Sequence, residues 1–243
     1  MDQTTTSRWK AWWGRPGWDR FVHIAAAVTF VLAVGVFLEL ADDAPEGDYL
    51  PIESKIMQGL RDAGQPLGPA GTAAVIRDIT AMGSAVVLII MTLLVLGYLC
   101  MSGRLRVAAL IAVATAGGQA LNLILKHAFA RERPDAALHL VEVTSTSFPS
   151  GHSMASSIFY LTIGALLART AKRRREKSYF VGSAMLITFL IGVSRVYLGV
   201  HYPTDVLAGW SAGAAWAMVC WFFADWLGRR GKLREDTGEQ RRV

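Results

Sequence analysis

The sequence predicts an all-α membrane protein: a bundle of six transmembrane helices with a short amphipathic helix between the first and the second. Two observations predict this fold. Of the 243 residues, 53% are hydrophobic and only 18% are charged, whereas a soluble domain carries about 25% charged residues. Six apolar stretches also approach or reach the ~20 residues that cross a bilayer core. This composition argues against a soluble enzyme, a DNA-binding domain and a disordered protein.

The apolar stretches differ in how strongly they predict a membrane span, and three of them contain no charged side chain. The expected spans are 21–41, 82–101, 107–125, 153–168, 179–194 and 206–224. The fourth and fifth spans are short and are expected to extend into their flanking residues. The first span could be a signal peptide, but no small-x-small cleavage site follows it. We therefore expect a retained membrane anchor.

Basic residues are concentrated in alternate segments between the spans. The tail 1–20, the connections 102–106 and 169–178, and the tail 229–243 hold 18 of the 25 Lys and Arg residues. Six helices place these segments on one side, and the positive-inside rule makes that side cytoplasmic. We therefore expect a membrane domain over 21–228 in the cell inner membrane, with both tails cytoplasmic and no nucleic-acid partner. The cluster KRRREK could alternatively be a patch for a lipid surface or a nucleic acid.

A short helix is expected between the first two spans, in residues 50–62. Ile52, Ile56 and Leu60 are four residues apart with polar residues between them, which is the stripe of an amphipathic helix. The helix could lie on the outer membrane interface and guide a lipid headgroup. It could equally cover the end of the bundle.

Lys126 and Arg133 are seven residues apart in KHAFARERP, on the side of the membrane that is poor in basic residues. Seven residues are about two helical turns, so both side chains could share a helix face while the helix lasts. Pro134 disfavours helix at Arg133 and is expected to end it there. A lone Lys at a span end usually snorkels to the interface. The residues between the two cations are expected to lie on the rim: His127, Arg131 and Glu132.

The segment FPSGHS, residues 148–153, stands directly before the fourth span. Ser150 is expected to be an N-cap, and Gly151 lets the backbone approach a ligand closely. The free N–H groups of a helix start form an anion site, and His152 lies in the first turn. Taken alone, the short motif indicates no more than a capped helix start.

The segment SRVYLGVHYPTD, residues 194–205, precedes the sixth span. Arg195 stands six residues before His201, and Asp205 stands four residues after it. Pro203 suits the first turn of a helix, which places His201 at the helix entrance. A carboxylate one turn further in can hold one imidazole nitrogen and leave the other free to attack. An interfacial His beside a capping Asp is the alternative.

These three segments share one face of the membrane. They supply three cations, a helix N-terminus and two histidines, one of which has a carboxylate partner. Phosphoryl transfer requires this combination: positive charge around the equatorial oxygens, a nucleophile, and a proton donor for the leaving oxygen.

The same segments resemble the three signatures of the type 2 phosphatidic acid phosphatase superfamily. K-x6-RP lies at 126–134, PSGH at 149–152, and SR-x5-H-x3-D at 194–205. All three signatures are complete, in order, and attached to the expected six-helix pattern. The resemblance implies a metal-independent membrane lipid phosphatase that works through a phosphohistidine and needs no cofactor.

The resemblance also implies a role for each matched residue. His201 would be the nucleophile, Asp205 would orient and polarise it, and His152 would be the general acid and later the base for water. The remaining matched residues would bind the phosphoryl oxygens: Lys126, Arg133, Ser150, Gly151 and Arg195.

Several functions remain open at this point. The resemblance suggests undecaprenyl diphosphate, phosphatidylglycerophosphate or phosphatidic acid as a substrate at the periplasmic or outer face, and an outward site favours undecaprenyl diphosphate. A phosphotransferase that uses a lipid or sugar alcohol as the acceptor is an alternative. A lipid-binding protein or channel, with Gln119 and Asn122 along a polar path, is another, although such residues more often join helices by hydrogen bonds.

Overall fold

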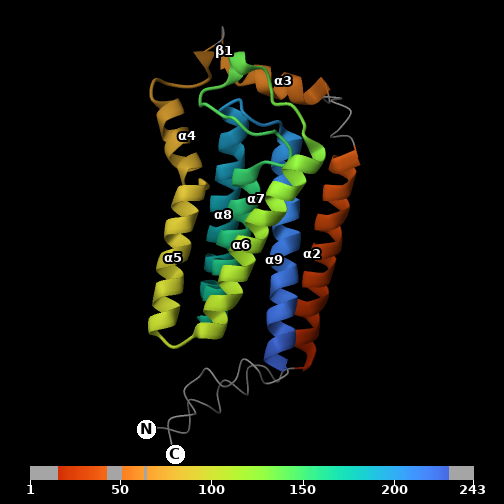
Figure 1. Cartoon of the computed structure of the whole chain (residues 1–243), viewed down its shortest axis with the longest axis vertical. Helices are drawn as coiled ribbons and strands as arrows, with labels where there is room; N and C mark the ends of the chain where they lie inside the picture. Colours follow the sequence, from red (N-terminus) through yellow and green to blue (C-terminus); the bar gives the residue numbers. More distant parts are fainter. Residues whose placement is uncertain (1–15, 43–50, 63–64, 230–243) are drawn as a thin grey trace, which may run out of the picture.

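The computed structural model describes residues 16–42, 51–62 and 65–229, and it confirms the all-α bundle (Figure 1). The helices are α2 (Pro16–Asp42), α3 (Pro51–Gly59), α4 (Thr72–Ala81), α5 (Ala85–Met101), α6 (Leu105–Phe129), α7 (Gly151–Thr170), α8 (Arg174–Tyr197) and α9 (Pro203–Arg229). The smaller elements are an antiparallel pair of strands, β1 (Arg61–Asp62) and β2 (Gln65–Pro66), and a 3-10 turn, η1 (Ala136–Leu138). Of the expected tails, residues 1–15 and 230–243 lie outside the described residues.

Within the described ranges, five helices are long and apolar enough to cross a membrane, and the bent pair α4 and α5 makes a sixth candidate. The chain is therefore a multi-pass membrane protein. The sequence had placed the second span at 82–101 and had missed α4, because Arg77 and Asp78 interrupt its apolar pattern. The pair bends by 43° at the break after Ala81, and Ser84 caps α5 by accepting a hydrogen bond from the Val87 N–H.

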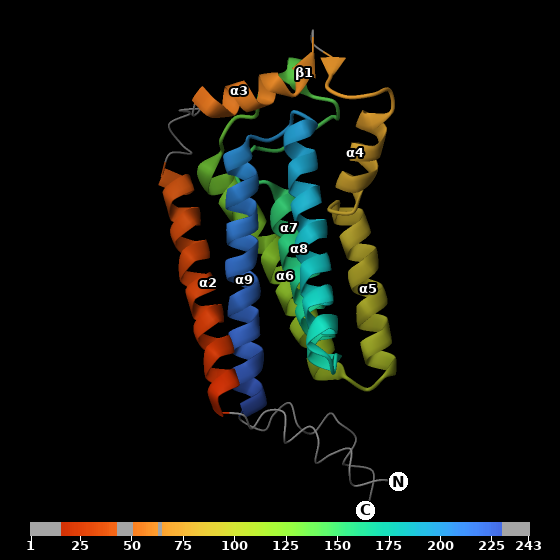
Figure 2. The ribbon, with the colours of Figure 1, turned by 180° about the vertical axis from the view of Figure 1, so that it is seen from behind.

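The two views of the ribbon show how the helices are arranged (Figures 1 and 2). α7 lies inside the bundle and packs mainly against α8 and α9, while α2 runs along α9 and α5 runs along α6. α3 lies across one end of the bundle, which we call the α3 end. The first residue of α2 and the last of α9 lie at the opposite end, together with the α5–α6 and α7–α8 connections. Arg104 and the basic residues of 172–177 therefore share one end of the bundle.

α3 has two different faces. Ile52 and Ile56, from the apolar stripe that the sequence predicted, are 61% and 41% exposed, whereas Glu53 and Met57 are only 1% and 3% exposed. The periodicity predicted the helix correctly, but Ile52 and Ile56 face away from the bundle, whereas Leu60, just after the end of α3, packs against the cluster of Tyr197, Leu198 and Val200. The side chains of Glu53 and Met57 face the bundle instead.

Small residues let α7 and α9 approach closely, as is common between membrane helices. A Cβ on Gly213 of α9 would lie 2.7 Å from both the Met154 carbonyl oxygen and the Ser157 Cβ of α7. Because one of these atoms belongs to the helix backbone, the helices would have to move apart to admit a methyl group.

Gly213→Ala is therefore expected to destabilise the bundle by about 1–3 kcal/mol, the usual range for overpacking. The measurement is the thermal unfolding midpoint in detergent. Gly182→Ala on α8 is the matched control, since no atom lies within 4 Å of its added Cβ, and its midpoint should not fall. Equal midpoints for wild type and Gly213→Ala would show that the contact between α7 and α9 is not tight.

Candidate active site

The structure brings the predicted site residues together at the α3 end. Lys126 lies on α6, and Arg133 and Ser150 lie in the connection between α6 and α7. Gly151 and His152 begin α7, and Arg195 lies near the end of α8. His201 lies in the turn between α8 and α9, and Asp205 lies in the first turn of α9. Side chains from four helices and two connections thus meet in one place, because all of these helices begin or end at the same end of the bundle.

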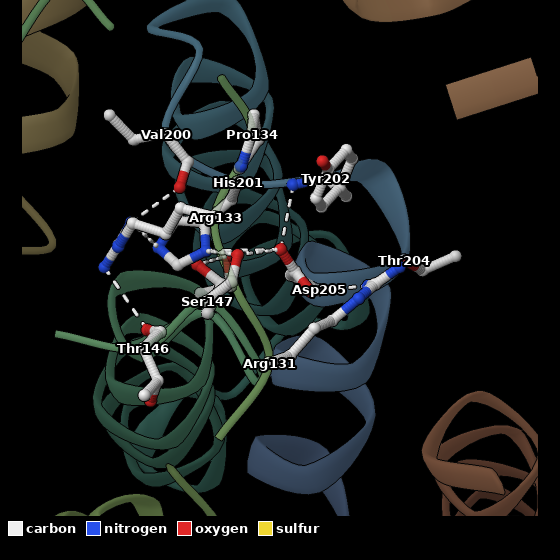
Figure 3. A network of polar contacts seen from close by, with 12 residues as sticks. Arg131, Arg133, Pro134, Thr146, Ser147, Val200, His201, Tyr202, Thr204 and Asp205 are labelled. Atoms are coloured by element: carbon white, nitrogen blue, oxygen red, sulfur yellow. Dashed lines mark hydrogen bonds and ion pairs between the residues drawn. The ribbon is translucent and has the colours of Figure 1, made fainter. Parts of the chain in front are cut away.

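His201 is held between a carboxylate and a guanidinium (Figure 3). Its Nδ1 lies 3.5 Å from Oδ2 of Asp205, and its Nε2 lies 3.3 Å from Nη1 of Arg133. Arg133 can only donate, so Nε2 is the acceptor and the proton of the neutral ring belongs on Nδ1, facing the carboxylate. The lone pair of Nε2 therefore points toward the cationic side of the site.

Burial keeps the imidazole of His201 neutral. The side chain is 2% exposed, and the loss of solvation lowers the pKa of His201 from 6.5 to about 3. The hydrogen bond and charge of Asp205 oppose this shift, whereas Arg133 and Arg195 reinforce it. A neutral imidazole is the form that can act as a nucleophile.

The carboxylate of Asp205 is fully buried and accepts hydrogen bonds at both oxygens (Figure 3). Oδ2 accepts from Ser147 Oγ at 2.5 Å and from the Tyr202 N–H at 2.8 Å, and Oδ1 accepts from Arg131 Nη1 at 2.8 Å. The backbone carbonyl of Asp205 accepts from the Ser150 N–H at 2.9 Å. These bonds tie the α6–α7 connection to the start of α9 and fix the carboxylate behind His201.

Arg131 is not a rim residue, contrary to the sequence-based expectation. It is 6% exposed, donates to Asp205 and to Thr204 Oγ1 at 2.9 Å, and lies over the Tyr202 ring. The chain turns inward after α6 and brings the guanidinium to the first turn of α9, where a buried carboxylate requires a charged partner. His127 and Glu132 are exposed, as expected.

Lys126 and Arg133 converge, but not on one helix face. α6 ends at Phe129 and Ala130 adopts a left-handed conformation with φ 45°, so the helix stops before Pro134 can act on it. Arg133 instead folds back in the connection and donates to the carbonyls of Ser145 and Val200. Both cations meet at the Thr146 carbonyl, at 2.5 Å from Lys126 Nζ and 3.4 Å from Arg133 Nη2.

Gly151 lies close to the side chains of α6 at the start of α7. A Cβ there would lie 3.2 Å from Asn122 Nδ2 and 3.5 Å from Lys126 Cε. Asn122 is 4% exposed, and its Oδ1 has no hydrogen-bond partner within the described residues. The idea of a polar path is not supported, because Gln119 of the same helix is exposed on the outside of the described bundle whereas Asn122 is buried.

Arg195 reaches the site from the last turn of α8. Its Nη1 donates to Thr80 Oγ1 of α4 at 3.1 Å, and its buried Nε has no acceptor within the described part of the chain. A buried N–H without an acceptor is unfavourable. An anion bound between the cations would supply that acceptor.

The start of α7 completes the site. His152 lies in the first turn, where the charges of Arg195, Arg133 and Lys126 act on it. Ser150 occupies the N-cap position, but its side chain makes no capping bond and instead accepts from Ser153 Oγ at 3.0 Å. The expected cap is thus correct in position and wrong in its hydrogen bond.

Sequence reasoning missed three further residues that contact the Asp205 network. Ser147 precedes PSGH by two positions, and Thr204 lies inside the third signature, but neither has a spacing that marks it. Glu53 lies on α3, with its Oε1 3.0 Å from the Thr204 N–H. A lone acidic residue beside an apolar stripe gave no signal, because such residues are usually solvated.

Comparison with known proteins adds independent information. A family model described as the PAP2 superfamily matches residues 107–229. A phosphatidylglycerophosphatase B of Bacillus subtilis is 45% identical over 96 residues, which cover 38% of this chain and 46% of that protein. An undecaprenyl-diphosphatase of Sulfolobus acidocaldarius is 38% identical over 71 residues, 29% of this chain and 30% of that protein. The chain thus aligns with less than half the length of either relative.

A solved structure matches more of the chain. The crystal structure of a transmembrane PAP2 type phosphatidylglycerolphosphate phosphatase from Bacillus subtilis superposes with a TM-score of 0.72 at 28% identity. The match covers 82% of this chain and 97% of that chain. The similarity in fold therefore extends over most of the chain.

Proposed function

The chain belongs to the PAP2 superfamily, and we propose that it is an integral-membrane phosphatase that removes a phosphoryl group from a lipid. The observation that carries this proposal is the placement of His201 between Asp205 and Arg133. A neutral imidazole with a carboxylate behind it and cations before it is a nucleophile facing an anion site.

In the first chemical step, Nε2 of His201 attacks the phosphorus atom, a P–N bond forms, and the bond from phosphorus to the leaving oxygen breaks. Asp205 stabilises the positive charge that develops on the imidazole by accepting from Nδ1–H. His152 donates a proton to the leaving oxygen, and the phosphate dianion bound beside it favours the protonated form of its ring.

In the second step, water attacks the phosphohistidine. His152, now neutral, takes a proton from the water molecule, the P–N bond breaks, and inorganic phosphate leaves. The imidazole of His201 returns to its neutral state with its Nδ1 proton still facing Asp205. Each residue ends the cycle in the protonation state in which it began.

The phosphoryl oxygens bind to side-chain cations in this proposal. Lys126 and Arg133 both donate to the Thr146 carbonyl, and the buried Nε–H of Arg195 has no acceptor among the described residues. Ser150 and Gly151 add the start of α7, where the helix dipole favours negative charge. We expect no metal ion to take part, because these cations neutralise the equatorial oxygens.

The substrate class follows from the relatives and the membrane setting. Sequence reasoning favoured undecaprenyl diphosphate, and one relative carries that name. The Bacillus subtilis relative and the solved structure are named for phosphatidylglycerophosphate, which fits at least as well. We propose a lipid phosphate monoester or diphosphate, with phosphatidylglycerophosphate as the first candidate and undecaprenyl diphosphate as the second.

We also propose that the α3 end faces the periplasm or the outside of an inner membrane. The basic residues of the α5–α6 and α7–α8 connections lie at the opposite end of the bundle, and positive charge marks the cytoplasmic side. The substrate headgroup would then meet the site at the outer leaflet.

His201→Gln is expected to reduce phosphate release from every lipid substrate by roughly 10⁴-fold or more, since the nucleophile is lost. The measurement is inorganic phosphate released by purified enzyme in detergent. His127→Gln is the matched control, because His127 is exposed and takes no part in the mechanism. Full activity in His201→Gln would exclude the phosphohistidine.

A side-by-side assay tests the substrate class. Phosphatidylglycerophosphate, undecaprenyl diphosphate and phosphatidic acid would be compared in one detergent with EDTA present. We expect phosphate release from at least one of them, with kcat/KM ranking the candidates. Failure on all three, with folded protein, would reject the proposed activity, and activity restored by adding a divalent metal would reveal a cation site.

The pH profile should reflect the low pKa of His201. A group with a pKa of about 3 stays neutral well below pH 6.5, so kcat/KM should fall on the acid side only as the pH approaches 3. On the alkaline side kcat, which reports the enzyme with phosphate bound, should fall as His152 loses the proton it must donate. Samples returned to pH 7 would separate titration from unfolding. An acid limb near pH 6.5 set by His201, or a flat profile from pH 4 to 9 with chemistry rate-limiting, would contradict the assignment.

A further inference from the structure

Glu53 is a buried carboxylate outside the three signatures. It lies on α3 and is 1% exposed, although a buried carboxylate is costly unless it is paired and hydrogen-bonded. Its Oε1 accepts from the Thr204 N–H at 3.0 Å and from Thr204 Oγ1 at 2.6 Å. Its Oε2 lies 3.4 Å from Arg131 Nη2.

The first of these contacts caps α9. The helix begins at Pro203, so the Thr204 N–H is one of the first-turn donors that have no partner within the helix. Caps are ordinarily supplied by the residue directly before the helix, whereas Glu53 stands 151 positions away in the sequence. Its negative charge at the helix N-terminus adds a favourable interaction with the helix dipole.

The second contact connects Glu53 to the proposed nucleophile. Arg131 lies between two carboxylates: Nη2 faces Glu53 and Nη1 donates to Asp205 at 2.8 Å. Thr204 Oγ1 joins the same set, because it donates to Glu53 and accepts from Arg131 at 2.9 Å. The chain of contacts therefore runs from α3 through Arg131 and Thr204 to Asp205.

We propose that Glu53 is a positioning residue for phosphoryl transfer: by capping α9 and holding Arg131, it fixes Asp205 and through it the imidazole of His201. The inference rests on the proposed function. It assigns α3 a part in the chemistry, because the helix supplies the carboxylate that orients the start of α9.

The geometry indicates which kinetic constant should change. The contact between Asp205 and His201 is 3.5 Å, at the limit of a hydrogen bond, so a small shift of α9 would break it. Among the described residues, the hydrogen bonds and ion pair of Glu53 go to Thr204 and Arg131, and not to Lys126, Arg133 or Arg195, which bind the phosphoryl group in the proposed function. Loss of Glu53 should therefore lower kcat and leave KM nearly unchanged.

The test compares Glu53→Gln with Glu132→Gln, the same chemical change at an exposed carboxylate of the α6–α7 connection. Glu53→Gln is expected to lower kcat by about 10- to 100-fold, as a displaced catalytic group does. Its KM and its inhibition constant for inorganic phosphate should stay near those of wild type. Glu132→Gln should match wild type in all three.

A second pair of variants guards against misfolding of Glu53→Gln. Thr204→Val keeps the shape of the side chain but removes the hydroxyl between Glu53 and Arg131, and it should also lower kcat. Thr204→Ser restores the hydroxyl and should recover most of the rate. Melting temperature and gel filtration report the folded fraction of each protein.

The outcomes separate the two proposals. If wild type releases phosphate and both Glu53→Gln and Thr204→Val keep its kcat per folded molecule, Glu53 is structural only and the inference is overturned. A rise in KM with unchanged kcat would also overturn it, since that would place Glu53 in substrate binding. If wild type releases phosphate from no lipid, the proposed function is wrong, and the inference that rests on it is wrong as well.

Discussion

The carboxylate of Asp205 joins the separate elements at the α3 end of the bundle. It is fully buried, and such a group is stable only when its charge is paired and its oxygens are hydrogen-bonded. The partners come from the α6–α7 connection and from the turn before α9. The need to satisfy one buried charge thus explains why a long connection folds back over the start of α9, and why His201 points where it does.

Charge is separated across the imidazole of His201. Asp205, Glu53 and Arg131 form a paired cluster on the Nδ1 side, while Arg133, which shares the Thr146 carbonyl with Lys126, lies at Nε2. An anion approaching Nε2 meets positive charge first, because Arg133 lies at Nε2 and Arg131 offsets one of the two carboxylate charges behind the ring. This separation lets one small site hold a carboxylate that supports the nucleophile and still attract a phosphate.

The parts of the structure that the sequence predicted are those set by local patterns. Apolar runs predicted the spans, and motif spacing predicted that Lys126, His152 and His201 would meet at one end. Arg131 was misplaced because its surroundings depend on where α6 stops and on a carboxylate 78 positions away. Glu53 and Ser147 were missed for the same reason: their partners are distant in sequence, so no periodicity or spacing records them.

The cap that Glu53 provides at the start of α9 also determines how much of the chain a transfer of the site to another protein would require. The segment that matches the family model, 107–229, contains Asp205 and the residues that hold it, but it leaves out Glu53. A protein built with that segment alone would contain all three signatures, but the start of α9 would lack the capping carboxylate of Glu53. The smallest unit that can be transferred is therefore larger than the segment that matches the family model, because it must include α3.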